Sequence, residues 1–216
     1  MTTLTIPVPA TLAAGEIVAA GISAEDYLAQ YAETFHEWVE GVVIKMTPVT
    51  LQHDALSSYL RVLLTAYFEL NPIGRVLGEP FVMRLDAVRR LREPDLQIIL
   101  NGNPGELTDT VMIGPADICI EVVSAESVER DYGAKFSEYE KAGVSEYWII
   151  DPLRRRCDFN RRSEDGIYME MEPDDTGHYR TPLLPKLALH VPTLWRDELP
   201  GVIATGQAVQ QMLAAE

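Results

Sequence analysis

The amino-acid sequence predicts an α/β (α+β) fold in which helices pack on a mixed β-sheet. Two apolar runs, residues 91–100 and 116–124, are typical of strands that are covered on both faces. Residues 53–70 and 128–142 instead repeat their apolar side chains at helical spacing. Strands that alternate with helical segments indicate a sheet with helices on its faces.

The first elements are expected to be a short helix and a hairpin. Residues 1–22 are rich in Ala, Thr and Pro without periodicity, and we interpret them as an N-terminal arm. Ser23 is a good N-cap for a short helix, because acidic residues follow it in the first turn. Residues 35–46 alternate in polarity around Gly41, which predicts two strands joined by a turn.

The central segment is expected to hold the long helix and three strands. The helical pattern of residues 53–70 stops at Asn71-Pro72. The strands are expected at residues 75–85, 91–100 and 116–124, and residues 101–114 form a polar connection.

The C-terminal segment is expected to add a helix, a strand and a meander. The helix at residues 128–142 would stop at Gly143, before a strand at residues 146–151. The alternating segments that follow predict a β-meander at residues 156–162, 167–171 and 178–184. We expect an arm (1–22), a single domain (23–196) and a C-terminal tail with a short helix (197–216).

Composition is that of a globular protein with one substantial core. The 216 residues are 47% hydrophobic and 24% charged, and no window approaches the roughly 18 apolar residues that span a bilayer. The N-terminus lacks the basic start of a signal peptide, so we expect a soluble, cytoplasmic protein with no membrane partner. Its two cysteines do not suggest a zinc site, and the net charge of −15 repels polyanions at long range.

Two carboxylates in the apolar runs are the candidate site. Asp95 follows Pro94 at the start of one strand, and Glu121 lies in the middle of Ile-Cys-Ile-Glu-Val-Val. Burying an unpaired carboxylate costs many kcal/mol, so each needs a partner. If the two strands are neighbours, the acids converge and offer oxygen ligands to Mg²⁺ or Mn²⁺. Alternatively, Asp95 caps a turn and Glu121 pairs with an arginine such as Arg84 or Arg92.

These residues resemble a known nuclease pattern. Pro94-Asp95 followed by Glu121 is similar to the PD-(D/E)xK signature of nucleases with a restriction endonuclease-like core. A longer similarity, over nearly all of residues 23–196, is to the bacterial Uma-two family of restriction endonucleases. The matching stretches are EWVEGVVIKMTPVTLQH, EPDLQIIL, ADICIEVVSAESVERDYGAKFSEYEKAGVSEYWIIDP and TPLLPKLALHVPTLW. The resemblance implies a restriction endonuclease-like mixed sheet, here with the N-terminal hairpin and the C-terminal meander added.

The resemblance also implies roles for individual residues. Asp95 and Glu121 would hold the divalent metal. Val123 stands where the signature has lysine, and Lys135 on the following helix is the candidate replacement, orienting water or stabilising charge on the phosphate. The alternative is that Lys135 only forms an ordinary ion pair with Asp131 on a solvated helix.

Glu37 and His53 match further family positions and are candidate site residues. Spacing alone favours a structural role for both, such as a helix-start cap for His53, and the resemblance is what makes them candidates.

Three functions are compatible with these observations. The first is a metal-dependent endonuclease that hydrolyses phosphodiester bonds of nucleic acid, DNA being the expected substrate. Its phosphate contacts would come from one of two basic clusters. The clusters are Arg84, Arg89, Arg90 and Arg92, or Arg154, Arg155 and Arg156. The second is a catalytically inactive nuclease-like binding or regulatory protein, expected as a homodimer. The third is a structural domain whose acids do no chemistry.

Overall fold

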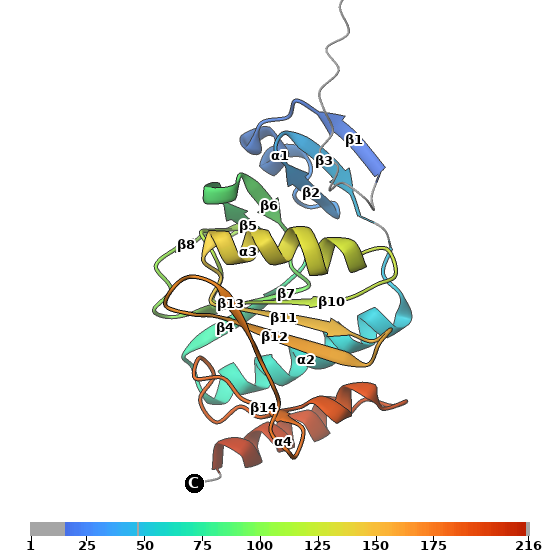
Figure 1. The fold of residues 1–216 in the computed structure, drawn as a ribbon, viewed down its shortest axis with the longest axis vertical. Coiled ribbons are helices and arrows are strands. Elements are labelled where there is room, and N and C mark those ends of the chain that lie inside the picture. The colour runs from blue at the N-terminus through green and yellow to red at the C-terminus, as the bar shows by residue number, and fades with distance from the viewer. Residues whose placement is uncertain (1–15, 47, 215–216) are drawn as a thin grey trace, which may run out of the picture.

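Helices cover both faces of a six-stranded sheet in the computed structural model, which describes residues 16–46 and 48–214 (Figure 1). The strand order is β13-β12-β11-β10-β7-β4, and within this sheet only β10 and β11 pair in parallel. In that order the strands are β13 (Tyr168–Met171), β12 (Arg156–Arg162), β11 (Glu146–Asp151), β10 (Ile118–Val122), β7 (Leu96–Leu100) and β4 (Gly74–Gly78).

Two helices lie on opposite faces of this sheet. Helix α2 (Leu51–Leu70) packs on one face, with α4 (Val202–Ala214) beneath it, and α3 (Phe136–Ala142) packs on the other (Figure 1). The N-cap of α2 is Thr50, whose hydroxyl accepts a hydrogen bond from the backbone N–H of His53. A π-helical turn, η2 (Arg130–Lys135), leads directly into α3.

Strand β10 separates two apolar cores according to the alternation of its side chains. Ile118, Ile120 and Val122 pack in the core on the α2 side. Cys119 and Val123 pack in the other core, together with residues of α3. Glu121 shares the parity of this second set, so it lies on the α3 side of the sheet.

A second, seven-stranded sheet has the order β1-β3-β2-β6-β5-β9-β8 and lies at the N-terminal end of the molecule (Figure 1). Its strands are β1 (Glu16–Ala20), β3 (Val42–Lys45), β2 (His36–Val39), β6 (Arg90–Arg92), β5 (Val82–Leu85), β9 (Val111–Ile113) and β8 (Glu106–Leu107). Helix α1 (Ala24–Gln30) buries Tyr27 against it, in a third apolar core with Trp38 and Leu91.

The remaining elements are short. Two 3₁₀ turns, η1 (Asp86–Val88) and η3 (Val191–Trp195), follow β5 and β15. Strands β14 (His178–Tyr179) and β15 (Leu189–His190) pair only with each other among the described strands.

Several predicted elements are confirmed. The short helix capped by Ser23, the hairpin with its turn at Gly41 and the long helix lie where the sequence places them. Strands β10 and β11 are also confirmed, as is the restriction endonuclease-like fold class.

Three strand predictions need correction. Residues 75–85 and 91–100 are each predicted as one strand, but each splits between the two sheets, into β4 and β5 and into β6 and β7. Proline lies in each break, at Pro80 and Pro94, where the missing N–H prevents continuous pairing. The connection at residues 101–114 contains β8 and β9.

The terminal segments also differ from the prediction. Residues 16–20 were assigned to the arm but form β1, which pairs with β3; residues 1–15 lie outside the described part. The meander ends at β13, because β14 leaves the sheet to pair with β15. Within the described residues, no helix combines the length and apolarity needed to cross a membrane.

Candidate active site at the junction of the two sheets

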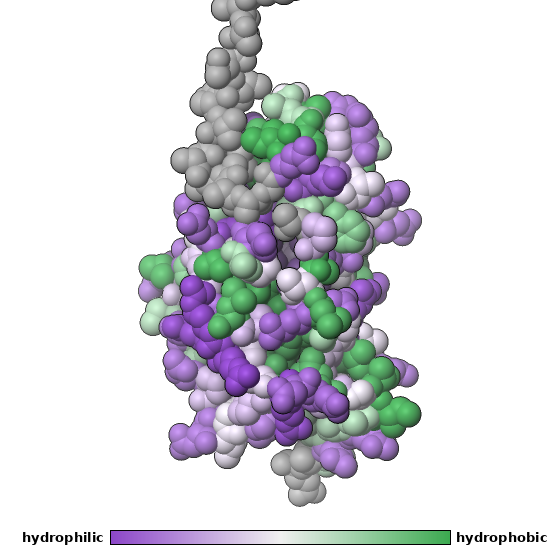
Figure 2. Space-filling model, turned by 90° about the vertical axis from the view of Figure 1, so that its right-hand side faces the viewer, coloured by the Kyte–Doolittle hydropathy of each residue, from purple (hydrophilic) through white to green (hydrophobic). Residues whose placement is uncertain are grey.

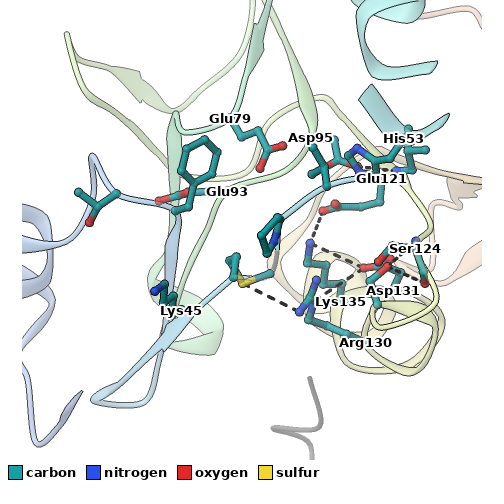
Figure 3. A pocket seen from close by; sticks show the side chains of 17 residues that line it. Lys45, His53, Glu79, Glu93, Asp95, Glu121, Ser124, Arg130, Asp131 and Lys135 are labelled. Carbon is teal, nitrogen blue, oxygen red and sulfur yellow. Dashed lines mark hydrogen bonds and ion pairs between the residues drawn. The ribbon is translucent and has the colours of Figure 1, made fainter. Parts of the chain in front are cut away.

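A pocket of about 560 Å³ brings residues of both sheets together with the first turns of α2 and η2. Figure 3 shows carboxylates of Asp95, Glu121 and Asp131 near the ammonium group of Lys135. Four of the five predicted site residues line the pocket, namely His53, Asp95, Glu121 and Lys135. The fifth, Glu37, lies behind it and contacts Lys135.

Asp95 is fixed at the start of β7 by two donors. The backbone N–H of Val122 donates to its Oδ2 at 2.6 Å, and His53 Nε2 lies 2.9 Å from the same oxygen. The antiparallel register of β7 and β10 pairs Leu96 with Ile120, so one further step places Asp95 opposite Glu121. The prediction that the strands of Asp95 and Glu121 lie side by side is therefore confirmed.

Glu121 is buried and receives its partners from the helix, not from its own strand. Lys135 Nζ lies 2.8 Å from its Oε1, and the Tyr139 hydroxyl donates to the same oxygen at 2.8 Å. Burial raises the pKa of Glu121, the nearby Asp95 and Asp131 raise it further, and Lys135 opposes them. The alternative pairing of Glu121 with Arg84 or Arg92 is wrong, because those arginines pair with other acids.

Lys135 is a buried cation surrounded by carboxylates. Besides Glu121, it lies 3.5 Å from Glu37 Oε1 and 3.7 Å from Asp131 Oδ1. Burial lowers the pKa of Lys135, but Glu121, Glu37 and Asp131 outweigh burial and raise it. The ordinary solvated ion pair considered for Asp131 and Lys135 is therefore wrong, since both side chains are buried.

The surroundings of Val123 explain why the positive charge beside Glu121 comes from Lys135 and not from the strand. Its side chain is buried in the apolar core under α3, where a lysine would be surrounded by hydrocarbon. The π-helical turn widens the backbone just before α3 and carries both Asp131 and Lys135. Single π turns inside helices occur often at functional sites.

Glu37 holds Lys135 from behind. Its Oε2 accepts a 2.6 Å hydrogen bond from Arg92, which also donates twice to Glu138 on α3. Burial raises the pKa of Glu37, but Lys135, Arg92 and Arg130 lower it to about 2. This buried network joins the hairpin and β6 of the seven-stranded sheet to α3.

His53 contacts Asp95 and does not cap α2. Burial alone lowers its pKa, but the hydrogen bond and charge of Asp95, with Glu79 and Glu121, raise it overall. A protonated His53 donates its Nε2–H to Asp95 and orients that carboxylate. The helix cap proposed as the alternative role belongs to Thr50.

Sequence reasoning missed several residues of the pocket. Glu79, Glu93 and Asp131 add carboxylates, while Lys45 and Arg130 add cations. Burial and Asp95 raise the pKa of Glu79 to about 6, and burial raises that of Glu93 to about 8. Only Glu93 carried a local signal, because it stands directly before the Pro94-Asp95 pair.

The predicted basic clusters do not line this pocket. Arg84 and Arg90 pair with acids, Arg92 is buried, and Arg154 and Arg156 pair with Asp151 and Asp158. Most of the arginines proposed for phosphate contacts therefore balance nearby carboxylates, and the cations of the pocket come from elsewhere.

The donor set suits a hard divalent cation that keeps part of its water shell. Among the described residues, no group of three or more His, Cys, Asp or Glu side chains is placed to hold a metal ion alone. Asp95 and Glu121 nevertheless offer carboxylate oxygens in a pocket where acidic side chains outnumber lysine and arginine. Mg²⁺ is commonly bound by one or two carboxylates, with water and substrate phosphate completing its shell.

Comparisons with known proteins identify a family and a similar fold. The model of the Uma2 (Uma-two) family, described as "Putative restriction endonuclease", matches residues 24–192. A solved structure described as "a putative nuclease belonging to DUF820" from Anabaena variabilis is similar, with a TM-score of 0.62 and 18% identity. The match covers 74% of this chain and 89% of that one. No curated protein matches the chain.

Proposed function

Because this chain belongs to the Uma2 family of restriction endonuclease-like proteins, we propose that it is a metal-dependent endonuclease that hydrolyses phosphodiester bonds of DNA. The observation that carries the proposal is the 2.8 Å contact of Lys135 with Glu121, in the same pocket as Asp95. A pair of metal-binding acids and a positive charge beside them are the parts that metal-assisted hydrolysis needs.

Asp95 and Glu121 would hold Mg²⁺ or Mn²⁺. When bound, such an ion acts as a Lewis acid on the phosphoryl oxygen and makes water a stronger nucleophile. The Val122 N–H and His53 keep Asp95 oriented, and the Tyr139 hydroxyl does the same for Glu121. Hydrogen-bonded partners of this kind commonly tune the affinity of metal ligands.

Lys135 would stabilise the negative charge that develops on the phosphate in the transition state. Its raised pKa keeps it protonated at neutral pH, so it acts as a fixed cation and not as a general base. Glu37, held by Arg92, keeps the ammonium group beside Glu121. Lys135 would thereby take the role of the signature lysine, whose position is occupied here by Val123.

The experiment is a cleavage assay with plasmid DNA, single-stranded DNA and RNA, with Mg²⁺, Mn²⁺ or EDTA. We expect cleavage that requires the metal and falls at least a hundredfold in Asp95→Asn, because this change removes a ligand charge at constant shape. The matched control is Asp54→Asn, an exposed acid one residue from His53, which should cleave like the wild type.

The absence of metal-dependent cleavage in the wild type would contradict the proposal. So would equal cleavage by the wild type and Asp95→Asn. The chain would then fit the alternative of a nuclease-like binding or regulatory protein that does not cleave.

A further inference from the structure

Phe35 lies at the pocket in a backbone conformation that aromatic residues rarely adopt. Its φ is 51°, in the left-handed region. Among the described residues, the other non-glycine positions with positive φ are Glu40, Arg89, Arg155 and Lys186, all charged and exposed. Phe35 is the apolar exception, and strained positions of this kind cluster at ligand-binding sites.

The local hydrogen bonds hold the backbone of Phe35 but do not bury its ring. Its carbonyl accepts from the Met46 N–H at 2.9 Å, and Thr34 donates twice to the Tyr31 carbonyl. The residue nevertheless stays 53% exposed while it lines the pocket. Core packing therefore gives no reason for an aromatic side chain at this position.

The surroundings of Phe35 combine an apolar wall with an exposed lysine. Met46, Pro48 and Val49 line the pocket beside it. Lys45 also lines the pocket, is exposed, and forms no ion pair within the described residues. Figure 2 shows hydrophobic and hydrophilic side chains intermixed over the face drawn there, without one broad apolar patch of the kind that binds a protein partner.

We propose that Phe35 stacks on an unpaired base of a single-stranded segment while Lys45 contacts its phosphate. This inference rests on the proposed function and names its substrate class. In a duplex the bases already stack on each other, so the ring reaches the face of a base only where the strand is single or the nucleotide is flipped out. A pocket of about 560 Å³ is within the size range of small-molecule sites, so a single unpaired nucleotide can enter it.

The charge of the protein favours the same conclusion. A net charge of −15 repels the phosphate backbone at long range, so little of the affinity comes from that backbone. Single-strand binding sites obtain much of their affinity from aromatic rings on which bases stack, whatever the base. Phe35 supplies such a ring in the pocket that also holds the carboxylates of the site.

The test measures the fluorescence of 2-aminopurine in a single-stranded ten-nucleotide DNA, titrated with the full-length chain in EDTA. Stacking on Phe35 should change the emission, and Phe35→Ala should weaken binding by about fivefold to a hundredfold. Phe35→Trp should retain binding. Ile167→Ala, an equally exposed apolar residue in the turn between β12 and β13, should bind like the wild type.

A second variant separates binding from folding. Asn tolerates the left-handed region, so Phe35→Asn should keep the urea midpoint of the wild type and still lose the fluorescence change. Equal binding by Phe35→Ala and the wild type overturns the inference, as does binding of blunt duplex in preference to single strands. Binding in EDTA is independent of cleavage, so the inference stands if cleavage is absent. If the wild type cleaves DNA but substitution of Phe35 does not change binding, the stacking inference is wrong and the proposed nuclease function remains.

Discussion

Lys135 shows how one buried side chain links the chemistry of the site to its stability. Three carboxylates surround its ammonium group, and burial leaves water little access to any of them. Removing one partner of such a cluster leaves uncompensated charge in the interior, which is more costly than the net value of the intact pairs. The same residue is therefore expected to matter for folding and for cleavage.

Lys135→Met should lower both the free energy of unfolding and the cleavage rate. We expect a loss of about 3 to 5 kcal/mol in urea unfolding, because buried Glu121 loses the cation that pairs with it. The single-turnover rate of DNA cleavage should fall roughly a hundredfold or more, because charge on the phosphate is no longer stabilised. Near-UV circular dichroism identifies conditions in which the variant is folded.

Lys141→Met is the matched control for this substitution. It removes an exposed lysine from α3, the helix that begins directly after Lys135, and should change neither quantity by much. Wild-type cleavage by folded Lys135→Met would show that the charge of Lys135 does not assist the reaction.

Tyr139 allows orientation of Glu121 to be tested without removing a charge. Tyr139→Phe deletes the hydroxyl that donates to Glu121 and leaves the ring packed against Tyr147. We expect about 1 kcal/mol of lost stability. The Mg²⁺ concentration at half-maximal cleavage should rise about tenfold, as it does when the partner of a metal ligand is removed.

Tyr168→Phe is the control, because its buried hydroxyl donates to the Val144 carbonyl in the same core but away from the pocket. It should lose similar stability and keep the Mg²⁺ requirement of the wild type. An equal shift in both variants would assign the effect to general loosening of the core.

The sequence predicted the acids of the site better than their partners. Asp95 and Glu121 stand out locally, because each interrupts an apolar strand. The partners Glu37, Arg92 and Glu138 are far apart in the chain and meet only through pairing of the hairpin with β6 and packing of α3. No local pattern encodes such a network, and only the family resemblance pointed to Glu37.

At the scale of elements, proline marks the point where one apolar stretch of sequence divides into strands of two different sheets. Residues 91–100 look like one strand because both halves are apolar and buried. Pro94 nevertheless ends pairing with β2 and β5, and the chain enters the other sheet beside β10. This step places Asp95 at the junction, so the break in the strand is also what exposes the carboxylate to the pocket.

Helix α4 was predicted as part of a tail, but it belongs to the main core. Val209 is fully buried in the cluster that contains α2 and β10. Val209→Ala should therefore lower the free energy of unfolding by about 2 kcal/mol, through lost burial and the cavity left behind. The measurement is urea unfolding followed by circular dichroism and tryptophan fluorescence, whose transitions should coincide.

Val202→Ala is the control at the exposed start of the same helix, where Val202 is 68% exposed. Its unfolding free energy should stay within about 0.5 kcal/mol of the wild type. An unchanged midpoint in Val209→Ala would mean that α4 does not contribute to the stability of the core.

At the scale of the whole molecule, each of the two sheets contributes different residues to the site. The six-stranded sheet carries Asp95 and Glu121, and η2 with α3 on its face supplies Lys135. The seven-stranded sheet supplies Phe35 just before β2 and Lys45 at the end of β3. Hydrophobic periodicity predicted the strands and helices but not their division between sheets, because both sheets bury strands of similar composition.

The net charge of the molecule leads to a prediction about salt. Phosphate binding releases counterions, and the slope of log affinity against log salt is about −0.7 per neutralised phosphate of a single strand. Only Lys45, Arg130 and Lys135 bring positive charge to the pocket from lysine and arginine among the described residues. The slope for a single-stranded oligonucleotide should therefore be no steeper than about −2.

Lys45→Gln tests which cation contributes to this slope. Removing the exposed ammonium should make the slope shallower by about 0.7 and weaken binding at low salt. Lys141→Gln, which removes an exposed lysine away from the pocket, should leave the slope unchanged. A wild-type slope of about −4 would require more cations than this pocket holds. Nucleic acid would then contact a basic surface elsewhere, and stacking at Phe35 would no longer be the main source of affinity.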